Sequence, residues 1–252
     1  MSGRSRSYRR LVIVTDTERY SSRSSVLQHE AQAAFDEALT AAARVADVDR
    51  PAWQRQPSGD GELAVLPPEV DEPLLLSAFL PAIDTHLRRY NAYRVTEARI
   101  RIRVALHQGL LFVDSRNGFA GEAVNTTARL VDAPPLKAAF RAFPAANVAC
   151  IVSDGIYRDI VCGGYEGIRR DRYSKIKVEL PDKDFAEDAW ISILSEDVTT
   201  IGLDPPRAGS PEPSPTGPAG SGVSTGNIDN NGGQVAVGHQ AQAYGAPPRS
   251  GR

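Results

Sequence analysis

Residues 10–16 read RLVIVTD, in which four apolar residues and a threonine stand in a row before an aspartate. A strand with one solvated face alternates apolar and polar residues, whereas a strand buried on both faces does not. This β-branched run is too continuous for a solvated face. It therefore predicts a buried central strand that ends at Asp16.

Helical and strand periodicities alternate downstream of this strand. Apolar residues three and four apart predict helices, and short apolar or alternating runs predict strands. In chain order we expect a helix over residues 26–48, strands over 53–56 and 62–66 around an Asp-Gly turn, a helix over 72–89 bent at Pro81, a strand over 100–113 that breaks at Gly109, a helix over 126–140 interrupted at Pro134 and Pro135, a strand over 147–153, a helix over 154–160, and strands over 176–179 and 189–194. This mixture predicts an α/β or α+β sandwich in which helices cover one sheet.

The composition excludes several classes of protein. The 252 residues carry 29 basic and 31 acidic side chains, without the basic excess that nucleic-acid binding by bulk charge requires. No apolar run approaches the roughly 18 residues of a membrane span, and the N-terminus lacks the apolar core of a secretory signal. We expect a cytoplasmic protein without nucleic-acid or membrane partners. Cys150 and Cys162 are predicted to be reduced core thiols.

The proline and glycine content of the chain rises sharply at Asp204, which indicates a boundary there. The 49 residues from there to Arg252 contain 8 of the 18 prolines and 10 of the 21 glycines. Such a segment buries too little apolar surface to offset the entropy of ordering it, so we expect it to be disordered. The prediction is one domain over residues 8–195, a linker over 204–225, a distinct segment over 226–245 and a disordered end over 246–252.

Three segments carry the polar residues suited to chemistry. Asp16 ends the first strand, and Asp60 lies in the turn of PSGDGELAVL. GEAVNTTARL places Asn125 and Arg129 four residues apart on one helical face. Two carboxylates suit a pair of Mg²⁺ ions on a triphosphate, because Mg²⁺ takes hard oxygen ligands and leaves positions for phosphate and water. An asparagine and an arginine on one face can orient a ribose and neutralise a phosphate.

Each of these residues also has a structural interpretation. Asp16 can cap the strand end or place a charge in the first turn of the next helix, and Asp60 can be a turn residue. Asn125 can be the N-cap of its helix, and Arg129 can be an exposed helix charge. The four residues together, in this order, favour a nucleotide site.

The same segments resemble the class III nucleotidyl cyclase catalytic domain, that of adenylyl and guanylyl cyclases, over most of residues 8–195. RLVIVTDTERYSS resembles the first metal strand of the family, QPSGDGELAVL its second metal hairpin, and RVALHQG the strand usually read as RIGIHTG. GEAVNTTARL matches the pattern GxxVNxAxRL except that Thr127 replaces the usual alanine. SDGIYRDIV and the strand with Lys175 and Lys177 resemble the last third of the domain. The resemblance implies a ferredoxin-like α+β fold, one mixed sheet covered by helices.

The resemblance also implies a two-metal mechanism. Asp16 and Asp60 would hold two Mg²⁺ or Mn²⁺ ions, which activate the ribose 3′-hydroxyl of an NTP and bind its triphosphate. Attack on the α-phosphorus forms a 3′,5′-cyclic nucleotide and releases pyrophosphate. Asn125 would orient the ribose, Arg129 would stabilise charge on the α-phosphate, and Lys177 would contact the terminal phosphates. In the family the metal pair and the Asn-Arg pair come from different subunits, so a homodimer with two sites is expected.

Two positions depart from the family pattern. Adenylyl cyclases read adenine with a lysine four residues before the second metal aspartate and an aspartate seven before the asparagine, and these positions are Gln56 and Gly118 here. The usual guanine pair is absent as well. Either the base is another one, such as a pyrimidine in anti-phage signalling, or base recognition has drifted. The alternative to an enzyme is an inactive adaptor that keeps the cyclase fold and acts through dimerisation and its C-terminal segment.

The C-terminal segment has a pattern of its own. Residues 226–245 read GNIDNNGGQVAVGHQAQAYG, in which a QVAVG core of low charge is flanked by Asn and Gln, as in segments that stack into cross-β ladders. The segment resembles bacterial amyloid signalling motifs and the RIP homotypic interaction motif. This resemblance implies an effector protein with a matching segment. The other interpretation is a flexible tail rich in Gly and Asn.

Overall fold

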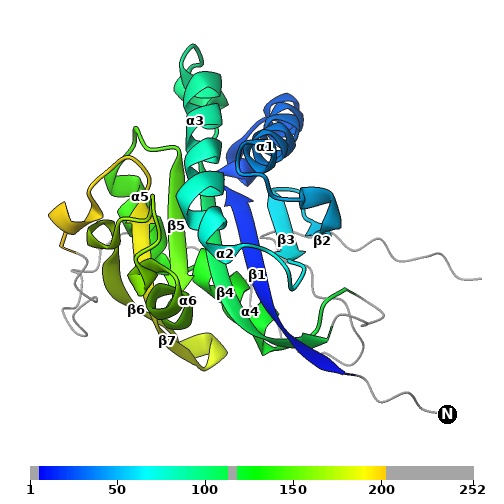
Figure 1. Ribbon diagram of the computed structural model, residues 1–252. Helices are drawn as coiled ribbons and strands as arrows, with labels where there is room; N and C mark the ends of the chain where they lie inside the picture. The colour runs from blue at the N-terminus through cyan, green and yellow to red at the C-terminus, as the bar shows by residue number, and fades with distance from the viewer. Residues whose placement is uncertain (1–5, 113–117, 203–252) are drawn as a thin grey trace, which may run out of the picture. The chain divides into compact units, whose positions relative to one another are not determined.

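The computed structural model describes residues 6–112 and 118–202. Its centre is a seven-stranded sheet in the order β2-β3-β1-β4-β5-β7-β6, in which β4 and β5 are parallel and the other described neighbours antiparallel (Figure 1). The strands are β1 (Ser7–Thr17), β2 (Gln54–Pro57), β3 (Gly61–Val65), β4 (Ile102–Phe112), β5 (Val148–Ser153), β6 (Ser174–Leu180) and β7 (Phe185–Ile193). This mixed sheet with its helices confirms the predicted α+β fold.

Helices cover both faces of the sheet (Figure 1). α1 (Ser25–Val45), α3 (Leu80–Asn91) and α6 (Asp154–Asp159) pack on one face, and α4 (Glu122–Val131) and α5 (Pro134–Ala142) pack on the other. The predicted linker, C-terminal segment and disordered end lie outside the described residues.

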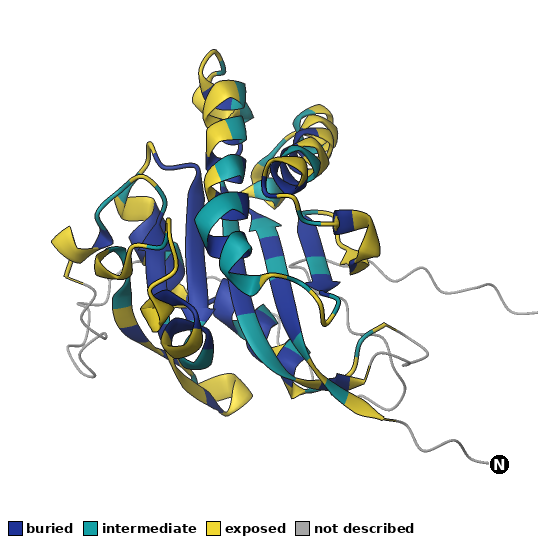
Figure 2. Ribbon diagram, in the orientation of Figure 1, coloured by how far each residue is buried: buried dark blue, intermediate teal, exposed yellow. Residues whose placement is uncertain are grey.

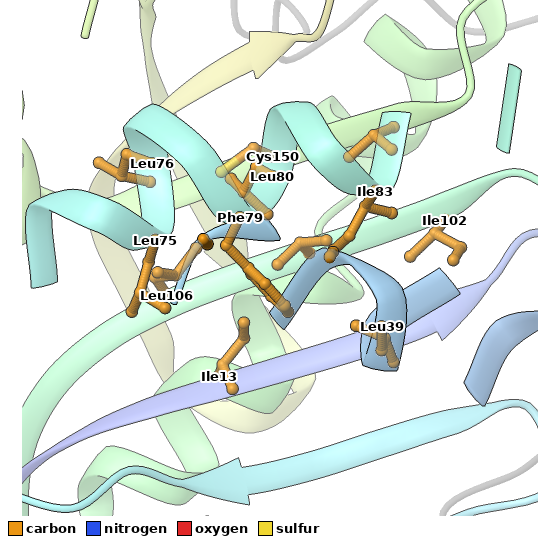
Figure 3. Packing of buried hydrophobic residues seen from close by; sticks show 14 of the residues in the cluster. Ile13, Leu39, Leu75, Leu76, Phe79, Leu80, Ile83, Ile102, Leu106 and Cys150 are labelled. Carbon is orange, nitrogen blue, oxygen red and sulfur yellow. The ribbon is translucent and has the colours of Figure 1, made fainter. Parts of the chain in front are cut away.

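The central strand β1 is buried on both faces, as predicted. Leu11 and Ile13 pack into the cluster under α1 and α3, whereas Val12 packs on the face of α4. Figure 2 shows the strands buried at the centre, with exposed residues on the outer sides of α1 and α3. In Figure 3, Phe79 and Leu80 from the helical layer lie over Ile13 and Leu106 of the sheet. This core holds the C-terminal end of β1, and with it Asp16, in a defined place.

Next to Pro81, where a bend was predicted, the helix contains a wider, irregular turn. A π-helix (η3, Leu75–Phe79) joins α2 (Glu72–Leu74) to α3. Pro81 then lies in the first turn of α3, next to a segment whose hydrogen-bond ladder is already irregular. Within this turn Leu75, Leu76 and Phe79 are buried.

Two predicted boundaries were wrong. Gly109 does not break β4, because it pairs with Arg10 in a continuous register. A Cβ at Gly109 would lie 2.9 Å from the Cβ of Ala123, so glycine permits the close approach of α4 to the sheet. The helix predicted to start at residue 126 already begins at Glu122, as α4, whereas the predicted interruption at Pro134 is confirmed, because α5 starts there.

The expectations drawn from composition have mixed outcomes. Cys150 is a buried thiol in β5, but Cys162 is exposed, so the prediction that both are core thiols was wrong for Cys162. Cys162 follows α6 in a short 3₁₀ turn whose neighbour Val161 supplies the buried side chain instead. Within residues 6–112 and 118–202, no helix has the length and apolar character needed to cross a membrane.

Candidate active site

Asp16 and Asp60 come together at one end of the sheet. In the antiparallel register of β1 and β3, Asp16 lies opposite Gly61, the residue after Asp60. The N–H of Thr17 donates to the carbonyl oxygen of Asp60 at 2.8 Å, and Ser58 Oγ donates to Asp60 Oδ1 at 3.1 Å. The Asp-Gly turn therefore brings the second predicted carboxylate beside the first.

Asp16 is held by an arginine to which the sequence interpretation gave no role. Arg103 lies opposite Asp16 in the pairing of β1 and β4 and donates from Nε to Oδ1 at 2.8 Å and from Nη2 to Oδ2 at 2.6 Å. Burial raises the pKa of Asp16 to about 6; Arg103 opposes this rise and the nearby Asp60 adds to it. The charge of the ionised carboxylate is therefore only partly compensated.

The two carboxylates fit a divalent cation that arrives with phosphates. No group of three or more His, Cys, Asp or Glu side chains suited to a metal occurs in residues 6–112 and 118–202. Mg²⁺, however, commonly binds through one or two carboxylates and completes its shell with phosphate and water. Two hard oxygen ligands, one of them incompletely neutralised, are such a donor set.

A hollow of about 290 Å³ opens beside the turn that carries Asp60. It lies between the β2-β3 hairpin, the short 3₁₀ helix η1 (Tyr20–Ser22) and α1. Its lining residues are Thr17, Tyr20, Gln32, Phe35, Asp36, Arg55 and the hairpin residues 57–62. Gln32 Nε2 donates to the carbonyl oxygen of Gly59 at 2.9 Å and ties the turn to α1. Asp60 thus sits on a fixed turn that remains open on one side.

The structure brings Gln56 and Gly118 into contact. Gly118 has a φ of +91°, and a Cβ built on it would lie 2.6 Å from Gln56 Oε1. The Gln56 amide therefore occupies the space that a side chain at position 118 would need. The two positions predicted to read the base are neighbours, although 62 residues apart in sequence.

Asn125 and Arg129 share one face of α4. Asn125 is exposed and is the fourth residue of the helix, so its interpretation as the N-cap was wrong; Gly121 occupies that position. The Arg129 guanidinium carbon lies 5.1 Å from the ring centre of Phe185, at the start of β7. The side chain of Arg129 thus points along the sheet toward β7.

Asn125 and Arg129 are not brought to Asp16 within one chain. Asp16 shares a row across the sheet with Arg103, Ala149 and Ile193. β7 lies three strands away from β1 in the sheet, and Phe185 is at the opposite end of β7 from Ile193, eight residues before it. With about 4.8 Å between strands and about 3.3 Å per residue, the guanidinium over Phe185 is roughly 15 Å or more from the Asp16 carboxylate. Within one chain, the two predicted pairs of site residues therefore lie apart.

Lys177 also lies apart from the two aspartates. It is on β6, the edge strand opposite β2, and its Nζ pairs with Glu179 at 2.9 Å. Lys175 pairs with Asp188 at 2.7 Å. Both lysines are about half exposed, so each surface pair leaves its lysine accessible.

Arg103 is the site residue that the sequence interpretation missed. Alternation along the strand placed it on one face of β4, but its partner follows only from the register between β1 and β4. A basic residue within the apolar first half of β4 is the signal that could have indicated a carboxylate partner.

Comparison with known proteins gives matches among solved structures alone. No family model and no curated protein matches the chain. The chain is similar to an adenylate/guanylate cyclase/hydrolase from Silicibacter pomeroyi, with 17% identity, 75% of this chain and 99% of that chain covered, and a TM-score of 0.49. The chain is also similar to the guanylate cyclase domain of RhGC from Catenaria anguillulae in complex with GTP, with 17% identity, 74% of this chain and 97% of that chain covered, and a TM-score of 0.45. For the guanylyl cyclase Cya2 the identity is 12%, the coverage is 75% of this chain and 92% of that chain, and the TM-score is 0.48.

Proposed function

We propose that this protein is a nucleotidyl cyclase-like enzyme that converts an NTP into a 3′,5′-cyclic nucleotide and pyrophosphate. The observation that carries the proposal is the pair of carboxylates, Asp16 and Asp60, at adjacent positions of β1 and the β2-β3 turn. This pair occurs in one chain with the Asn125 and Arg129 face of α4. Carboxylates for metal-bound phosphates and a donor pair for ribose and phosphate are the groups that cyclisation needs.

Each residue has a role in the proposed reaction. Asp16 and Asp60 hold two Mg²⁺ or Mn²⁺ ions, which when bound supply Lewis acidity at the 3′-hydroxyl and the triphosphate. Asn125 hydrogen-bonds to the ribose and fixes the 3′-oxygen in line with the α-phosphorus. Arg129 donates to the α-phosphate oxygens as their charge grows. Lys177 leaves its ion pair with Glu179 and binds the terminal phosphates of the substrate.

The separation of the two pairs of site residues supports a homodimer. Arg129 is too far from Asp16 in its own chain to contact a phosphate bound there. A second copy in a symmetric dimer can supply Asn125 and Arg129 to the first, and the first supplies the same residues in return. Two equivalent sites result, each with the aspartates of one subunit and the α4 residues of the other.

The contact between Gln56 and Gly118 bears on which base is bound. A side chain at position 118 would meet the Gln56 amide, so of these two positions Gln56 is the one that offers a side-chain hydrogen bond. An amide both donates and accepts, so Gln56 does not by itself select a base. Because the two positions carry neither the usual adenine pair nor the usual guanine pair, we propose a base outside these two patterns, such as a pyrimidine.

The enzyme proposal is tested by incubating the full chain with each of the four NTPs and Mn²⁺, beside Asp60→Asn. A cyclic product that the Asp60→Asn variant fails to make is the expected result. No cyclic product from any NTP would overturn the proposal in favour of the inactive adaptor, whose dimerisation and C-terminal segment would then carry the function.

The shared site is tested by mixing two inactive variants, Asp60→Asn and Arg129→Ala. If the sites form between subunits, half of the dimers in an equal mixture are heterodimers with one intact site, so about a quarter of the wild-type activity returns. If each chain has its own complete site, the mixture stays inactive.

A further inference from the structure

Arg129 is a partly buried cation without an oxygen partner in its own chain. The other buried or partly buried arginines in residues 6–112 and 118–202 each donate to a carboxylate or a backbone carbonyl, as a cation withdrawn from water requires. Arg50, for example, pairs with Glu62 and Arg101 pairs with Glu18. Among these described residues Arg129 alone has no hydrogen bond or ion pair of this kind, so another contact holds its guanidinium.

That contact is the ring of Phe185. The guanidinium carbon of Arg129 lies over this ring, 5.1 Å from its centre, within the range in which the electron-rich face of an aromatic ring attracts a cation. A carboxylate in the same place would neutralise the guanidinium and occupy its N–H donors. The ring attracts the guanidinium without doing either. Arg129 therefore keeps its charge and its donors for an anion that comes from outside the chain.

The ring of Phe185 is itself fixed by the fold. Phe185 is the first residue of β7, lies opposite Leu180 in the pairing of β6 and β7, and is 8% exposed. It belongs to the same buried cluster as Leu130, the residue that follows Arg129 on α4. The core thus holds α4 and the start of β7 together, and the position of the ring determines where the guanidinium lies.

From these contacts we propose that Phe185 is the positioning residue of Arg129: its ring fixes the guanidinium and leaves the charge uncompensated for the α-phosphate. A donor that is in place before the reaction needs little reorganisation as charge grows on the phosphate. The role in catalysis rests on the proposed function, whereas the ring contact does not. Because Phe185 and Arg129 belong to one chain, Phe185 acts in the subunit that supplies Arg129 to the site of its partner.

The kinetics of cyclic nucleotide formation by the full chain test the role in catalysis. Phe185→Leu keeps an apolar side chain but removes the ring. It is expected to lower kcat about 10-fold and to leave KM within about 2-fold, since Arg129 acts on charge that appears in the transition state. Phe185→Tyr restores the ring and should recover about half of the activity or more. Tyr90→Leu is the matched control, because Arg94 lies over the Tyr90 ring on another part of the fold, and its kcat should stay within about 2-fold.

A mixture of inactive variants tests in which subunit Phe185 acts. When Asp60→Asn and Arg129→Ala chains are mixed, the intact site takes Arg129 from the Asp60→Asn chain. Adding Phe185→Leu to the Asp60→Asn chain should lower the restored activity about 10-fold, as in the homodimer. Adding it to the Arg129→Ala chain should leave the restored activity within about 2-fold, because that chain supplies the aspartates. A general loss of stability would lower the activity in both placements.

Nuclear magnetic resonance of the Arg129 Nε–H group tests the ring contact without substrate. The ring face shifts the resonance of a proton above it to lower frequency, and the signal is assigned by its absence in Arg129→Ala. In Phe185→Leu the resonance should return toward that of a solvated arginine, whereas in Phe185→Tyr it should stay shifted. If Phe185→Leu does not fold, Phe185→Met, whose unbranched side chain adapts to the same space, carries all three measurements.

Three results would overturn the proposal: an unchanged kcat in the folded variant without the ring, an equal loss in both placements of the mixture, or an Arg129 resonance that does not respond to loss of the ring. These results are separable from failure of the proposed function. Product formation with an unchanged kcat in Phe185→Leu would remove the positioning role and leave the cyclase. No cyclic product from any NTP would remove the role in catalysis together with the cyclase, and a ring-shifted Arg129 resonance would still establish the contact.

Discussion

Two carboxylates on neighbouring strands, the partly buried Asp16 on β1 and the buried Glu62 on β3, have different electrostatic surroundings. Glu62 points toward α1 and is held by Arg50 Nη2 at 3.2 and 3.0 Å and by Arg55 Nη1 at 3.3 Å. Asp16 points to the other face of the sheet, with one arginine and a second carboxylate, Asp60, nearby. Glu62 and Asp36 share two arginines, Arg50 and Arg55, whereas Asp16 pairs with the single arginine Arg103 and has the carboxylate of Asp60 nearby.

The difference favours a structural role for Glu62 and the proposed role of a metal ligand for Asp16. Arg50 also pairs with Asp36 of α1 at 3.1 Å, so the Glu62 group joins α1 to the β2-β3 hairpin. A further cation has no role there. Burial is the largest cause of the raised pKa of Asp16 and outweighs the opposing effect of Arg103, so the ionised carboxylate would gain from the charge of a divalent cation. The two carboxylates should therefore respond differently to neutralisation.

Activity should show the largest difference. Asp16→Asn is expected to lower cyclic nucleotide formation by at least about 100-fold, because metal ligation supplies several kcal/mol of transition-state stabilisation. Glu62→Gln should retain the activity of the wild type within several-fold per folded molecule. Chromatographic measurement of product with Mn²⁺ compares the two, and folded Glu62→Gln protein as inactive as Asp16→Asn would break the comparison.

Stability should show the reverse order. Glu62→Gln is expected to cost about 3–5 kcal/mol of the free energy of unfolding, since it leaves the buried Arg50 guanidinium without its main partner. Asp16→Asn at pH 7 should cost less than this, because removing a poorly compensated charge offsets part of the cost of leaving Arg103 without Asp16. Urea denaturation measures both. An equal loss in the two variants would mean that Asp16 is as structural as Glu62.

The pH dependence of stability gives a smaller and more specific effect. The folded-state pKa of Asp16 is about 6, above the ordinary aspartate value of 3.8, so the folded protein holds this proton more tightly than the unfolded chain. The stabilisation is complete below pH about 4 and is lost as the pH rises through 6, at about 2–3 kcal/mol in total. Without metal, the unfolding free energy of wild type minus that of Asp16→Asn should fall over this range. A flat difference would contradict the prediction.

The exposed partner of Glu62 should contribute least. The Arg55 side chain is 36% exposed, and Arg50 remains beside Glu62 when Arg55 is removed. Arg55→Ala is therefore expected to cost only about 0.5–1 kcal/mol. Thermal unfolding measures this change, and a loss as large as that of Glu62→Gln would show that Glu62 needs both cations.

Local sequence patterns predicted most of the fold because they act over a few residues. The apolar run at 11–15 gave a buried β1, the Asp-Gly turn gave the β2-β3 hairpin, and the helical spacing placed Asn125 and Arg129 on one face of α4. The errors came from distant contacts. Gly109 was expected to break its strand, but it is a glycine because α4 packs against it.

The candidate site was predictable only in part for the same reason. Asp16 and Asp60 were found from their places at a strand end and in a turn. Their surroundings depend on register, and a shift of one residue would turn Arg103 to the opposite face of β4. The contact between Gln56 and Gly118 likewise depends on a close approach that neither segment encodes alone.

The sequence by itself determined which elements form and which chemical groups they carry, because helix and strand periodicity and turn chemistry are local properties. Only the tertiary structure decided how those groups are compensated and combined. Arg103 meets Asp16 across 87 residues of sequence, and Arg129 ends up over Phe185 rather than near the aspartates. Register and packing between distant segments set these distances, and electrostatic energies depend on distance and burial more than on residue type.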